Sequence, residues 1–497
     1  MAESNSSTPD WVADAVFYQI FPDRFARSGR VDVGAKLEDW DEPPSFEGYK
    51  GGDLWGVIDR LDHLVELGIT AIWFNPIFQS ASNHRYHTHD YFRVDPMLGG
   101  EAAFDALVEA CHTRGIRVVL DGVFNHASRG FFQFSDVAEH GDKSAYRDWF
   151  TVDSFPIRPY DVDTPPTYEA WWGMHALPEL NTDNPQVAEY LWSVGEYWMH
   201  RGIDGWRLDV PNEISTPDFW EGFRRRVKAI NPEAYLVGEI WHAAPEWVGD
   251  ANRFDGVMNY KLTTAIIAFA VGNRIDRSTL LANPDYDVTP GLSAGGFADR
   301  IDWLTWMYPP ATQRAMLNLL DSHDTARIRT IARGDRSLVE LALSLLFVMP
   351  GAPCLYYGTE VGMEGGPDPD CRRGFPWADP DDWDTNTLAV VRRLIELRRA
   401  EPALRSTEIE RLGPPAGADF GRTWVVGRGA GADRLIVAVN HADEPDDVPM
   451  PVGTVAAEAE RVFGTARLVE SSAFVAAGPT TTMVMPPRSV GIWRAPR

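Results

Sequence analysis

Short apolar segments alternate with longer amphipathic segments over the first 400 residues of the chain. Eight segments are rich in β-branched and aromatic residues: 15–21, 69–76, 116–124, 203–210, 235–241, 254–260, 316–324 and 353–358. Helical spacing lies between them, as in Val57, Leu61, Leu64 and Leu67, after which Gly68 ends the predicted helix. Apolar strands that alternate with helices predict a parallel sheet covered by helices. Eight such units predict an α/β fold of the (β/α)8 TIM-barrel type.

Two parts of the chain depart from this alternation. Residues 127–180 are rich in aromatic residues, Asp, Gly and Pro, with weak periodicity, and indicate an insertion after the third strand. Short strands separated by turn residues predict an all-β sandwich at the C-terminus, at 422–429, 433–441, 466–470, 480–485 and 490–495. We therefore predict a barrel over 1–126 and 181–402, an insertion over 127–180 and a C-terminal β-sandwich over 403–497.

Charge and hydropathy exclude several classes of partner. The formal net charge is −26 over 497 residues, which argues against binding to nucleic acid or to an anionic membrane surface. The most apolar stretch, 341–357, is interrupted by Pro350, Gly351 and Pro353, so it predicts a helix, a turn and a strand rather than a membrane span. The N-terminal MAESNSSTPD has neither a basic start nor an apolar region. We therefore expect no secretory signal and a soluble, cytoplasmic protein.

Cysteine usage gives no sign of a disulfide framework or a zinc site. The chain has three cysteines, Cys111, Cys354 and Cys371, and none belongs to a C-x-x-C pair.

The segment GWRLDV (205–210) places an arginine and a carboxylate on one face of a predicted strand. Alternate residues of a strand share a face, so Arg207 and Asp209 point the same way. Burying two charges together requires pairing or a function. Taken alone, this pattern is explained by a structural ion pair.

Polar residues also end the neighbouring predicted strands, and together they favour a functional site. Besides Arg207 and Asp209, they are Asp121, Asn125 and His126 after the third strand, Glu239 after the fifth, and His323 and Asp324 after the seventh. The C-terminal ends of barrel strands meet at one rim, where barrel enzymes carry their active sites. A structural network explains one such end, but it does not readily explain four.

Three acids with an arginine and two histidines at one rim fit glycoside hydrolysis. One carboxylate attacks the anomeric carbon while a second, kept protonated, protonates the leaving oxygen. A third carboxylate can hold substrate hydroxyls, and Arg207 can keep the nucleophile ionised. The sequence contains neither a glycine-rich phosphate loop nor a histidine cluster suited to zinc.

Four of these strand ends carry motifs that resemble those of the α-amylase family (glycoside hydrolase family 13). They are DGVFNH (121–126), GWRLD (205–209), GEIW (238–241) and LLDSHD (319–324), in the family's order and at its strands. The resemblance implies that Asp209 is the nucleophile, Glu239 the general acid/base and Asp324 the stabiliser of the transition state. It also implies that the insertion is the family's domain B.

The same resemblance assigns substrate contacts. Arg207, His126 and His323 match residues that contact the sugar at the cleavage point, and Tyr86 matches the tyrosine that stacks on that sugar. We include Asp121 and Trp241 among the substrate-binding candidates.

Further motifs resemble the cyclomaltodextrinase, maltogenic amylase and neopullulanase branch of the family. They are DVPNEI (209–214), WWGMHALPELN (171–181), SHDTAR (322–327) and DPDCRRGFPW (368–377). By this resemblance Glu213 lies near the acceptor side, and Arg327 and Arg372 are substrate contacts, with solvated surface arginines as the alternative for the last two.

The sequence departs from that branch at several places. Branch members carry an N-terminal β-domain that helps dimers to form. Here the first strand begins near residue 15, so we expect this domain to be absent. A homodimer is therefore possible, but its mode of assembly is left open. Glu179 stands where a lysine is common, and His87 and His89 stand where Asp and Ala are frequent. These changes leave the substrate preference within the branch open, and both histidines are interpreted as structural.

A metal is not required by this chemistry. Asn125 matches an asparagine that binds calcium in many α-amylases, but Glu213 stands where the family's partner ligand is a histidine. A structural Ca²⁺ bound at Asn125 is therefore a hypothesis based on the resemblance.

The sequence predicts a retaining α-glucan hydrolase that cleaves α-1,4 bonds in short or cyclic malto-oligosaccharides. Candidate substrates are cyclodextrins and cyclic glucans with mixed α-1,4 and α-1,6 links. Glu239 is expected to have a raised pKa while Asp209 stays ionised. There are three alternatives. One is a transferase with a sugar acceptor, which Trp241 and Trp247 near Glu239 favour. The others are an amylase or neopullulanase acting on starch and pullulan, and a non-catalytic binding barrel.

Overall fold

The structure, a computed structural model, describes residues 8–34, 36–249, 252–281, 283–418, 421–450, 454–475 and 478–494. Residues 1–7, on which the prediction about a secretory signal partly rests, lie outside this description, as does residue 495 of the last predicted strand. No helix in the described ranges combines the length and the apolar character needed to span a bilayer.

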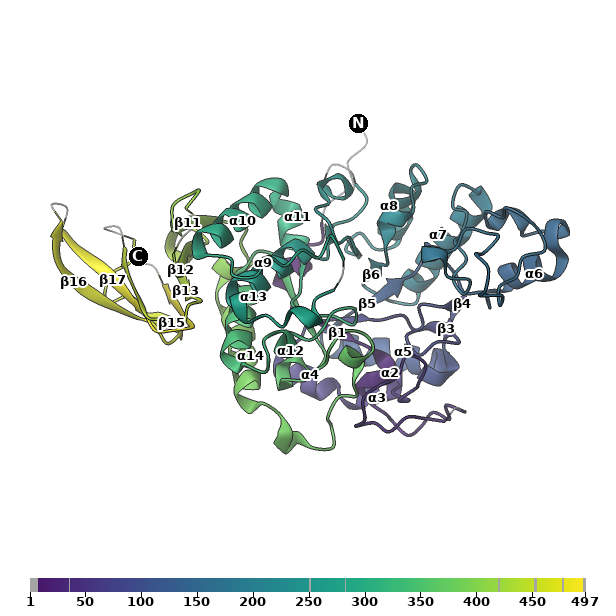
Figure 1. Ribbon diagram of the computed structural model, residues 1–497, viewed down its shortest axis with the longest axis horizontal. Coiled ribbons are helices and arrows are strands. Elements are labelled where there is room, and N and C mark those ends of the chain that lie inside the picture. The colour runs from purple at the N-terminus through teal and green to yellow at the C-terminus, as the bar shows by residue number, and fades with distance from the viewer. Residues whose placement is uncertain are drawn as a thin grey trace.

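A parallel eight-stranded sheet forms the centre of the molecule (Figure 1). Its strands are β1 (Phe17–Ile20), β2 (Ala71–Phe74), β5 (Arg117–Gly122), β6 (Gly205–Leu208), β7 (Tyr235–Gly238), β8 (Gly256–Val257), β9 (Leu317–Asn318) and β10 (Ala352–Tyr356). Each lies within one of the eight predicted segments. The order β8-β7-β6-β5-β2-β1-β10-β9 is closed by a parallel bridge between Met258 and Leu317, so the predicted TIM barrel is confirmed.

Helices surround this barrel on its outer side. They are α1 (Trp11–Asp14), α2 (Pro22–Phe25), α3 (Leu54–Asp59), α4 (Leu61–Leu67), α5 (Gly100–Thr113), α7 (Pro185–His200), α8 (Phe219–Ile230), α9 (Tyr260–Ala270), α10 (Ala294–Met307), α11 (Pro310–Ala315), α12 (Ile328–Ile331), α13 (Arg336–Val348) and α14 (Thr385–Ala400). The predicted helix before Gly68 is divided into α3 and α4 at Arg60, and Gly68 ends α4 in the left-handed conformation with φ 94°. The 341–357 stretch forms α13, a turn and β10, as predicted.

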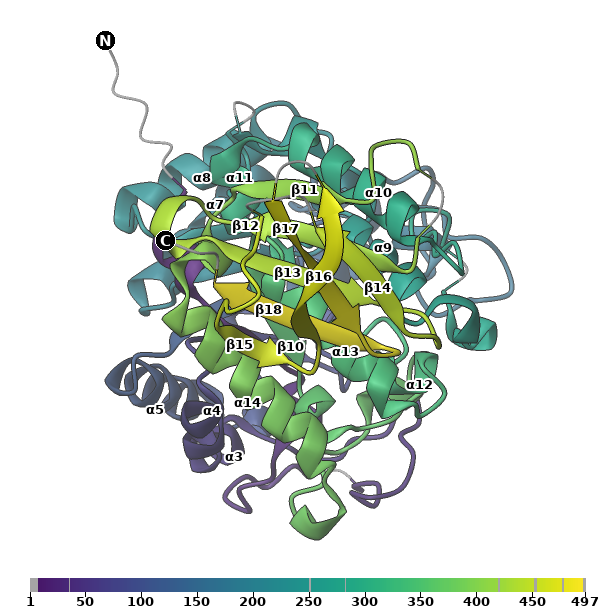
Figure 2. The same ribbon diagram turned by 90° about the vertical axis from the view of Figure 1, so that its left-hand side faces the viewer.

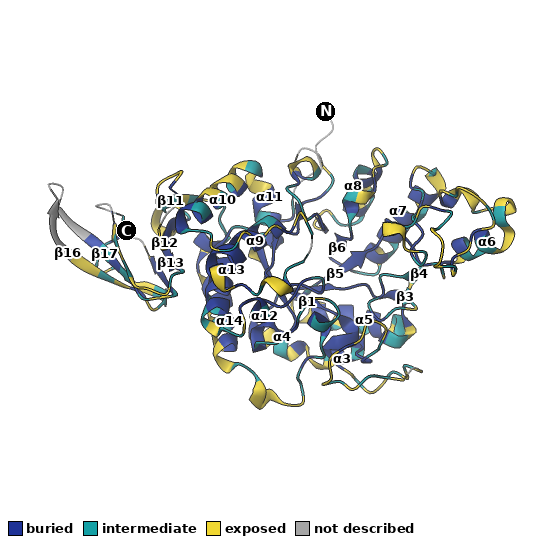
Figure 3. Ribbon diagram, in the orientation of Figure 1, coloured by how far each residue is buried: buried dark blue, intermediate teal, exposed yellow. Residues whose placement is uncertain are grey.

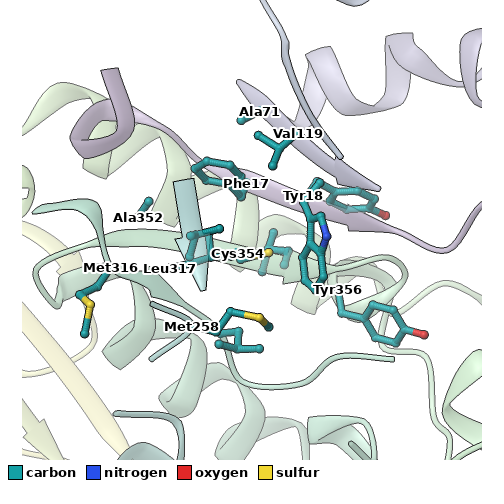
Figure 4. Close-up of a cluster of buried hydrophobic side chains, with 14 of the residues drawn as sticks. Phe17, Tyr18, Ala71, Val119, Met258, Met316, Leu317, Ala352, Cys354 and Tyr356 are labelled. Carbon is teal, nitrogen blue, oxygen red and sulfur yellow. The ribbon is translucent and has the colours of Figure 1, made fainter. Parts of the chain in front are cut away.

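The barrel strands are almost entirely buried, which is why their sequences are mostly apolar (Figure 3). Side chains from different strands meet in a shared apolar cluster that includes Phe17, Val119, Leu317 and Cys354 (Figure 4). Since these strands are packed from several directions, the core is rigid, and polar side chains just beyond the strand ends are held on a fixed base.

The segment after β5 projects from one end of the molecule in Figure 1. It contains α6 (Phe132–His140), three 3-10 turns (Gly141–Lys143, Arg147–Trp149 and Trp171–Gly173) and few strand contacts. A hairpin that the sequence did not indicate, β3 (Phe78–Ser80) and β4 (Thr88–Val94), lies beside it. Antiparallel pairing between His126 and Glu179 ties the two ends of the segment together, so that it returns to the rim it left.

The C-terminal residues form two antiparallel sheets that face each other (Figure 2). One sheet has the order β11 (Ile409–Gly413), β12 (Thr423–Arg428), β13 (Leu435–Asn440), β18 (Ser489–Arg494), β15 (Arg461–Gly464), and the other β14 (Asp446–Met450), β17 (Gly478–Met485), β16 (Arg467–Val475). A second apolar cluster, with Ile436, Met483 and Trp493, lies between them, which confirms the predicted sandwich.

A buried arginine attaches the sandwich to the barrel. The guanidinium of Arg428 donates hydrogen bonds to the carbonyls of Val348 (2.7 Å), Glu408 (2.7 Å) and Ser406 (2.7 Å). Val348 is the last residue of α13, where the carbonyls have no partner within the helix. One side chain of the sandwich therefore donates the hydrogen bond that a C-terminal carbonyl of a barrel helix lacks.

Candidate active site

The register of three adjacent strands places the acidic residues in layers. In the parallel pairs β5–β6 and β6–β7, Asp121 is opposite Arg207, and Leu208 is opposite Gly238. The next residues on β6 and β7 are Asp209 and Glu239, whose amides still donate to Gly122 O (3.0 Å) and Leu208 O (2.9 Å). Because alternate residues share a face, Arg207 and Asp209 point inward together, and Glu239 points inward beside them. The two acids are therefore neighbours in the backbone ladder.

Arg207 lies beneath these carboxylates and contacts three of them. Its Nη1 donates to both oxygens of Asp121 (2.8 and 3.0 Å) and to Oδ1 of Asp209 (2.9 Å). Its Nη2 lies 2.8 Å from Oε1 of Glu239, an ion pair without the alignment of a hydrogen bond. The guanidinium also packs over the ring of Trp73 at 5.1 Å and has no exposed surface. One buried cation thus serves three buried acids.

Burial raises the pKa values of these three acids. Burial is the largest cause for each, and Arg207 opposes it. The pKa of Asp121 is raised to about 6, that of Asp209 to about 7 and that of Glu239 to about 8. The raised pKa expected for Glu239 is present and is the highest of the three. The pKa of Asp209 is also raised, because burial outweighs the effect of Arg207, so the expectation that Asp209 stays ionised beside Arg207 remains a prediction.

The chain turns sharply directly after Asp209. Val210 adopts φ 34° and ψ 50°, a left-handed conformation that is costly for a β-branched residue. In this position its amide donates to Oε2 of Glu239 at 3.2 Å. The strained residue therefore connects the two acids through a backbone hydrogen bond.

His323 and Asp324 follow β9 and are oriented by a chain of buried polar side chains. Gln19, in the middle of β1, donates from Nε2 to Nδ1 of His323 at 2.8 Å and to Oδ1 of Asn75 at 2.9 Å. Burial lowers the pKa of His323 well below its usual value, so the imidazole is neutral and carries its proton on Nε2. That nitrogen lies 3.1 Å from Oδ2 of Asp324 and 2.7 Å from the hydroxyl of Tyr86.

Tyr86 joins this chain to the arginine layer. Its hydroxyl donates to Oδ2 of Asp121 at 2.9 Å, and its ring is parallel to that of His323, with centroids 5.4 Å apart. The tyrosine, the histidine and Asp121 therefore form one connected floor.

Arg372 holds the other side of Asp324. Its Nε donates to the carbonyl of His323 at 2.8 Å, and its Nη2 donates to Oδ1 of Asp324 at 3.4 Å. Its Nη1 lies 3.0 Å from Asp368, which the sequence analysis did not select. Asp324 keeps a raised pKa because of burial, which Arg372 and Arg207 oppose.

A cleft of about 610 Å³ opens above these groups. Of the predicted site residues, it is lined by Tyr86, His126, Asp209, Glu213, Glu239, Trp241, His323, Asp324 and Arg372. The volume suits a ligand of several sugar rings.

One wall of the cleft is a stack of three rings, one at the end of the third barrel segment and two from the insertion. The imidazole of His126 packs on Trp171 with centroids 4.8 Å apart, and Trp171 packs on Trp172 at 4.4 Å. Trp172 is 79% exposed, and both ring nitrogens of the buried His126 have no hydrogen-bond partner among the described residues. An unpartnered buried imidazole beside a free aromatic face is suited to a polyhydroxylated ligand.

The opposite wall is built on Trp241. Its ring is stacked on Tyr260, the first residue of α9, with centroids 3.8 Å apart and an angle of 7° between the planes. Tyr286 meets both rings at their edges. The indole is therefore held flat, with one face toward the cleft.

Several predicted substrate contacts do not line the cleft. Arg207 and Asp121 lie below it and act through Asp209, Glu239 and Tyr86. Arg327 is fully buried and donates to the carbonyls of Cys371 (2.9 Å) and Tyr357 (2.7 Å), so its predicted substrate contact is corrected to a brace between loops.

Of the residues at which the sequence departs from the branch, only His87 reaches the lining. Its ring lies at the edge of His84, another lining residue, whereas His89 and Glu179 lie outside it. Trp247 also lies outside the lining and stacks on Phe254, which removes it as support for a transferase.

Sequence reasoning missed Gln19, Trp171, Trp172 and Asp368. Gln19 did leave a signal, because it is a polar residue in the middle of an otherwise apolar strand. Trp171 and Trp172 lie in a segment with no clear periodicity, so no pattern placed their rings beside His126.

The surroundings of Asn125 do not supply the carboxylates of a typical calcium site. Asn125 is buried, its Nδ2 has no partner, and within the described ranges no group of three or more His, Cys, Asp or Glu side chains could hold a metal ion. Glu213 instead lines the cleft. The calcium hypothesis stays a prediction from resemblance, and no step below uses a metal. The three cysteines are buried and unbonded.

The chain is similar to known proteins in both sequence and fold. The family model described as "Alpha amylase, catalytic domain" matches residues 19–382. A cyclomaltodextrinase from a Bacillus species is 44% identical over 400 residues, which cover 80% of this chain and 68% of that protein. The crystal structure of a debranching enzyme from Nostoc punctiforme has a TM-score of 0.89 at 48% identity and covers 98% of this chain and 99% of that one. The cyclic α-maltosyl-(1→6)-maltose hydrolase from Arthrobacter globiformis has a TM-score of 0.83 at 36% identity, covering 98% and 99%.

Proposed function

This chain belongs to the α-amylase family of glycoside hydrolases, and from that membership we propose that it is a retaining hydrolase of α-glucosidic bonds in short or cyclic malto-oligosaccharides. The observation that carries the proposal is the position of Asp209 and Glu239 side by side at the ends of β6 and β7. Adjacent strands lie about 4.8 Å apart, and retaining glycosidases need carboxyl groups about 5–5.5 Å apart. The ladder therefore supports retention.

Each acid has a distinct task in this mechanism. Glu239, which has the highest pKa of the three acids around Arg207, donates its proton to the leaving glycosidic oxygen. Asp209 attacks the anomeric carbon to form a covalent glycosyl-enzyme. Glu239 then takes a proton from water, which attacks the same carbon and releases the sugar with its original configuration.

The remaining residues bind and orient the sugar at the cleavage point. Asp324 and the Nε2–H of His323 bind neighbouring hydroxyls, and Tyr86 lies flat beneath the ring. His126 donates to a further hydroxyl with a nitrogen that has no partner in the described chain. Arg207 favours the ionised form of Asp209 before the attack, and it stabilises the charge that develops on Glu239 as Asp209 becomes the neutral glycosyl ester.

The acceptor side of the cleft bears on the choice of substrate. Glu213, which the resemblance places near the acceptor side, is an exposed carboxylate of the cleft lining, and Trp172 and Trp241 add aromatic faces to the same lining. Relatives that are named for cyclic glucans, a cyclomaltodextrinase and a cyclic maltosyl-maltose hydrolase, support a cyclic substrate.

Cleavage of α-1,6 branches is the second candidate. It is favoured by the 48% identity to a debranching enzyme over almost the full length of both chains. Transfer to a sugar acceptor remains compatible with the same residues, and the flat Trp241 ring supports it. A homodimer is likewise a prediction, which sedimentation velocity at several protein concentrations would test.

The function is tested by product analysis on γ-cyclodextrin, a mixed-link cyclic tetrasaccharide, a maltosyl-branched glucan, pullulan and soluble starch. We expect rapid opening of a cyclic glucan, with the α-anomer formed first in proton NMR. Asp209→Asn and Glu239→Gln are expected to lower kcat by on the order of 10³-fold or more. The matched control is Asp204→Asn, which removes a carboxylate bound to Arg117 at the other end of β6. A β-anomer as first product, or full activity in Asp209→Asn, would overturn the mechanism.

A further inference from the structure

We propose that helix α10 carries a second glucan-binding site, outside the cleft, that holds part of a long α-glucan chain; this rests on the proposed function. The site is a surface hollow of about 430 Å³ lined by Lys261, Asp287, Gly296, Asp299, Arg300 and Trp303. These residues come from α9, from the segment before α10 and from α10 itself, on which Figure 3 shows both exposed and intermediate positions.

The hollow combines an aromatic face with charged groups that can bind hydroxyls. The indole of Trp303 is 39% exposed and forms one side. Arg300, beside it, makes no hydrogen bond or ion pair with any residue that the structure describes, so its guanidinium is available to a ligand. A sugar ring offers both partners at once, because its C–H face packs on an aromatic ring while its hydroxyls accept from a guanidinium.

The other charged residues of the hollow differ in how many of their polar atoms are already bound by protein groups. Asp299 is bound by Arg411 (2.5 Å) and by the amide of Gly417 (3.2 Å), which fixes one edge of the hollow to the C-terminal sandwich. Lys261 donates to the carbonyl of Asp285 at 2.6 Å. Asp287 faces the ammonium of Lys261 and keeps acceptor capacity for a hydroxyl.

The hollow and the cleft share a wall. Asn283 and Asp285 line the cleft, whereas Asp287, two residues further along, lines the hollow. Lys261, which binds Asp285, follows Tyr260, on which Trp241 of the cleft is stacked. Two residues of extended chain span about 7 Å. The lining of the cleft and the lining of the hollow are therefore neighbours along this segment, which is the route by which a glucan leaving the cleft would reach the hollow.

Trp306, one turn further along α10, provides a matched control. It is more exposed than Trp303, at 83%, but it does not line the hollow. A general effect of exposed tryptophan on solubility or association would follow Trp306, whereas binding in the hollow would follow Trp303.

The test measures binding and turnover separately. Affinity electrophoresis of Glu239→Gln in gels containing soluble starch is compared with the same protein carrying Trp303→Ala, Arg300→Ala or Trp306→Ala. We expect Trp303→Ala and Arg300→Ala to raise the apparent dissociation constant about three- to tenfold, and Trp306→Ala to leave it unchanged. Kinetics in the otherwise wild-type protein should show Trp303→Ala lowering kcat/KM on amylose about fivefold while the rate on γ-cyclodextrin is unchanged.

The outcomes distinguish the two proposals. Hydrolysis of γ-cyclodextrin with equal starch retardation of Trp303→Ala and its parent would overturn the second site and leave the proposed function intact. Loss of retardation in Trp303→Ala without hydrolysis of any α-glucan would support the second site while the proposed function fails. Loss in Trp306→Ala equal to that in Trp303→Ala would mean a contact between copies of the chain through α10, and the glucan site would be rejected.

Discussion

Replacing Asp121 with asparagine should move the acidic limb of the pH–activity profile to lower pH. Asp121 and Asp209 contact the same nitrogen of Arg207, at 2.8 and 2.9 Å. Asparagine has the same shape and can still accept from Arg207, but it removes one negative charge from the layer below Asp209. The ionised form of Asp209 is then opposed by one carboxylate fewer, so its pKa falls.

The size of this shift follows from the shared contact. Two oxygens bonded to one nitrogen in this way lie within about 6 Å of each other, and unit charges at that distance interact by ~2–3 kcal/mol at an effective dielectric of about 20. One pKa unit corresponds to 1.36 kcal/mol, and Arg207 lies between the two groups and screens them. We therefore expect a shift of about 1–2 pH units for Asp209, from a starting pKa of about 7.

The assay is kcat/KM on a cyclic glucan between pH 4 and 10, which reports the ionisations of the free enzyme. In the wild type, the acidic limb should lie near 7 and the basic limb, set by Glu239, near 8. Asp121→Asn should widen the profile mainly on the acidic side, because Glu239 contacts the other guanidinium nitrogen. Asp204→Asn, at the opposite end of β6, should cost stability but leave both limbs in place. An acidic limb that stays fixed, or moves to higher pH, in Asp121→Asn would refute the reasoning.

Three further outcomes are expected. Gln19→Leu should lower kcat/KM about tenfold, because Nδ1 of His323 loses its hydrogen-bond donor and the proton of the imidazole can move from Nε2 to Nδ1. A fall in Tm with unchanged steady-state kinetics would contradict this. The three carboxyl groups that contact Arg207 have folded-state pKa values raised to about 6, 7 and 8, so the folded state binds more protons than the unfolded state. Urea unfolding between pH 5 and 9 should therefore show the free energy of unfolding falling as pH rises through that window. A free energy of unfolding that rises with pH there would be inconsistent with the raised pKa values. Arg428→Met should cost ~2–4 kcal/mol in urea unfolding, because one buried and two partly buried carbonyls lose their donor. A loss below ~0.5 kcal/mol would show that water replaces the guanidinium.

The barrel could be predicted from the sequence because its strands are buried on both faces. Each of the eight lies in a short, mostly apolar segment of the sequence. The strands that were missed in the C-terminal part, β11, β14 and β15, are all at the edges of their sheets. Edge strands face solvent and carry polar residues, as Asp446 and Asp447 do in β14, so their hydrophobic pattern is weak.

The site was predictable where side chains belong to strand ends, and less so where loops supply them. The register of parallel strands alone brings Asp121, Asp209 and Glu239 to one rim. Arg327 was misjudged because its partners lie 30 and 44 residues away in the chain, at distances that no local pattern reports.

Because Asp209 and Glu239 are neighbours in the backbone ladder, the stereochemical outcome and the substrate range depend on different parts of the molecule and can change independently. Their spacing is inherited from the distance between hydrogen-bonded strands, so the stereochemical outcome belongs to the barrel. Trp172 and Glu213, which line the cleft, sit instead on connecting segments. Loops can therefore be exchanged, by drift or in the laboratory, without putting the anomeric configuration of the product at risk. Proteins built on this scaffold can therefore change their substrate range while the stereochemistry of the reaction stays the same.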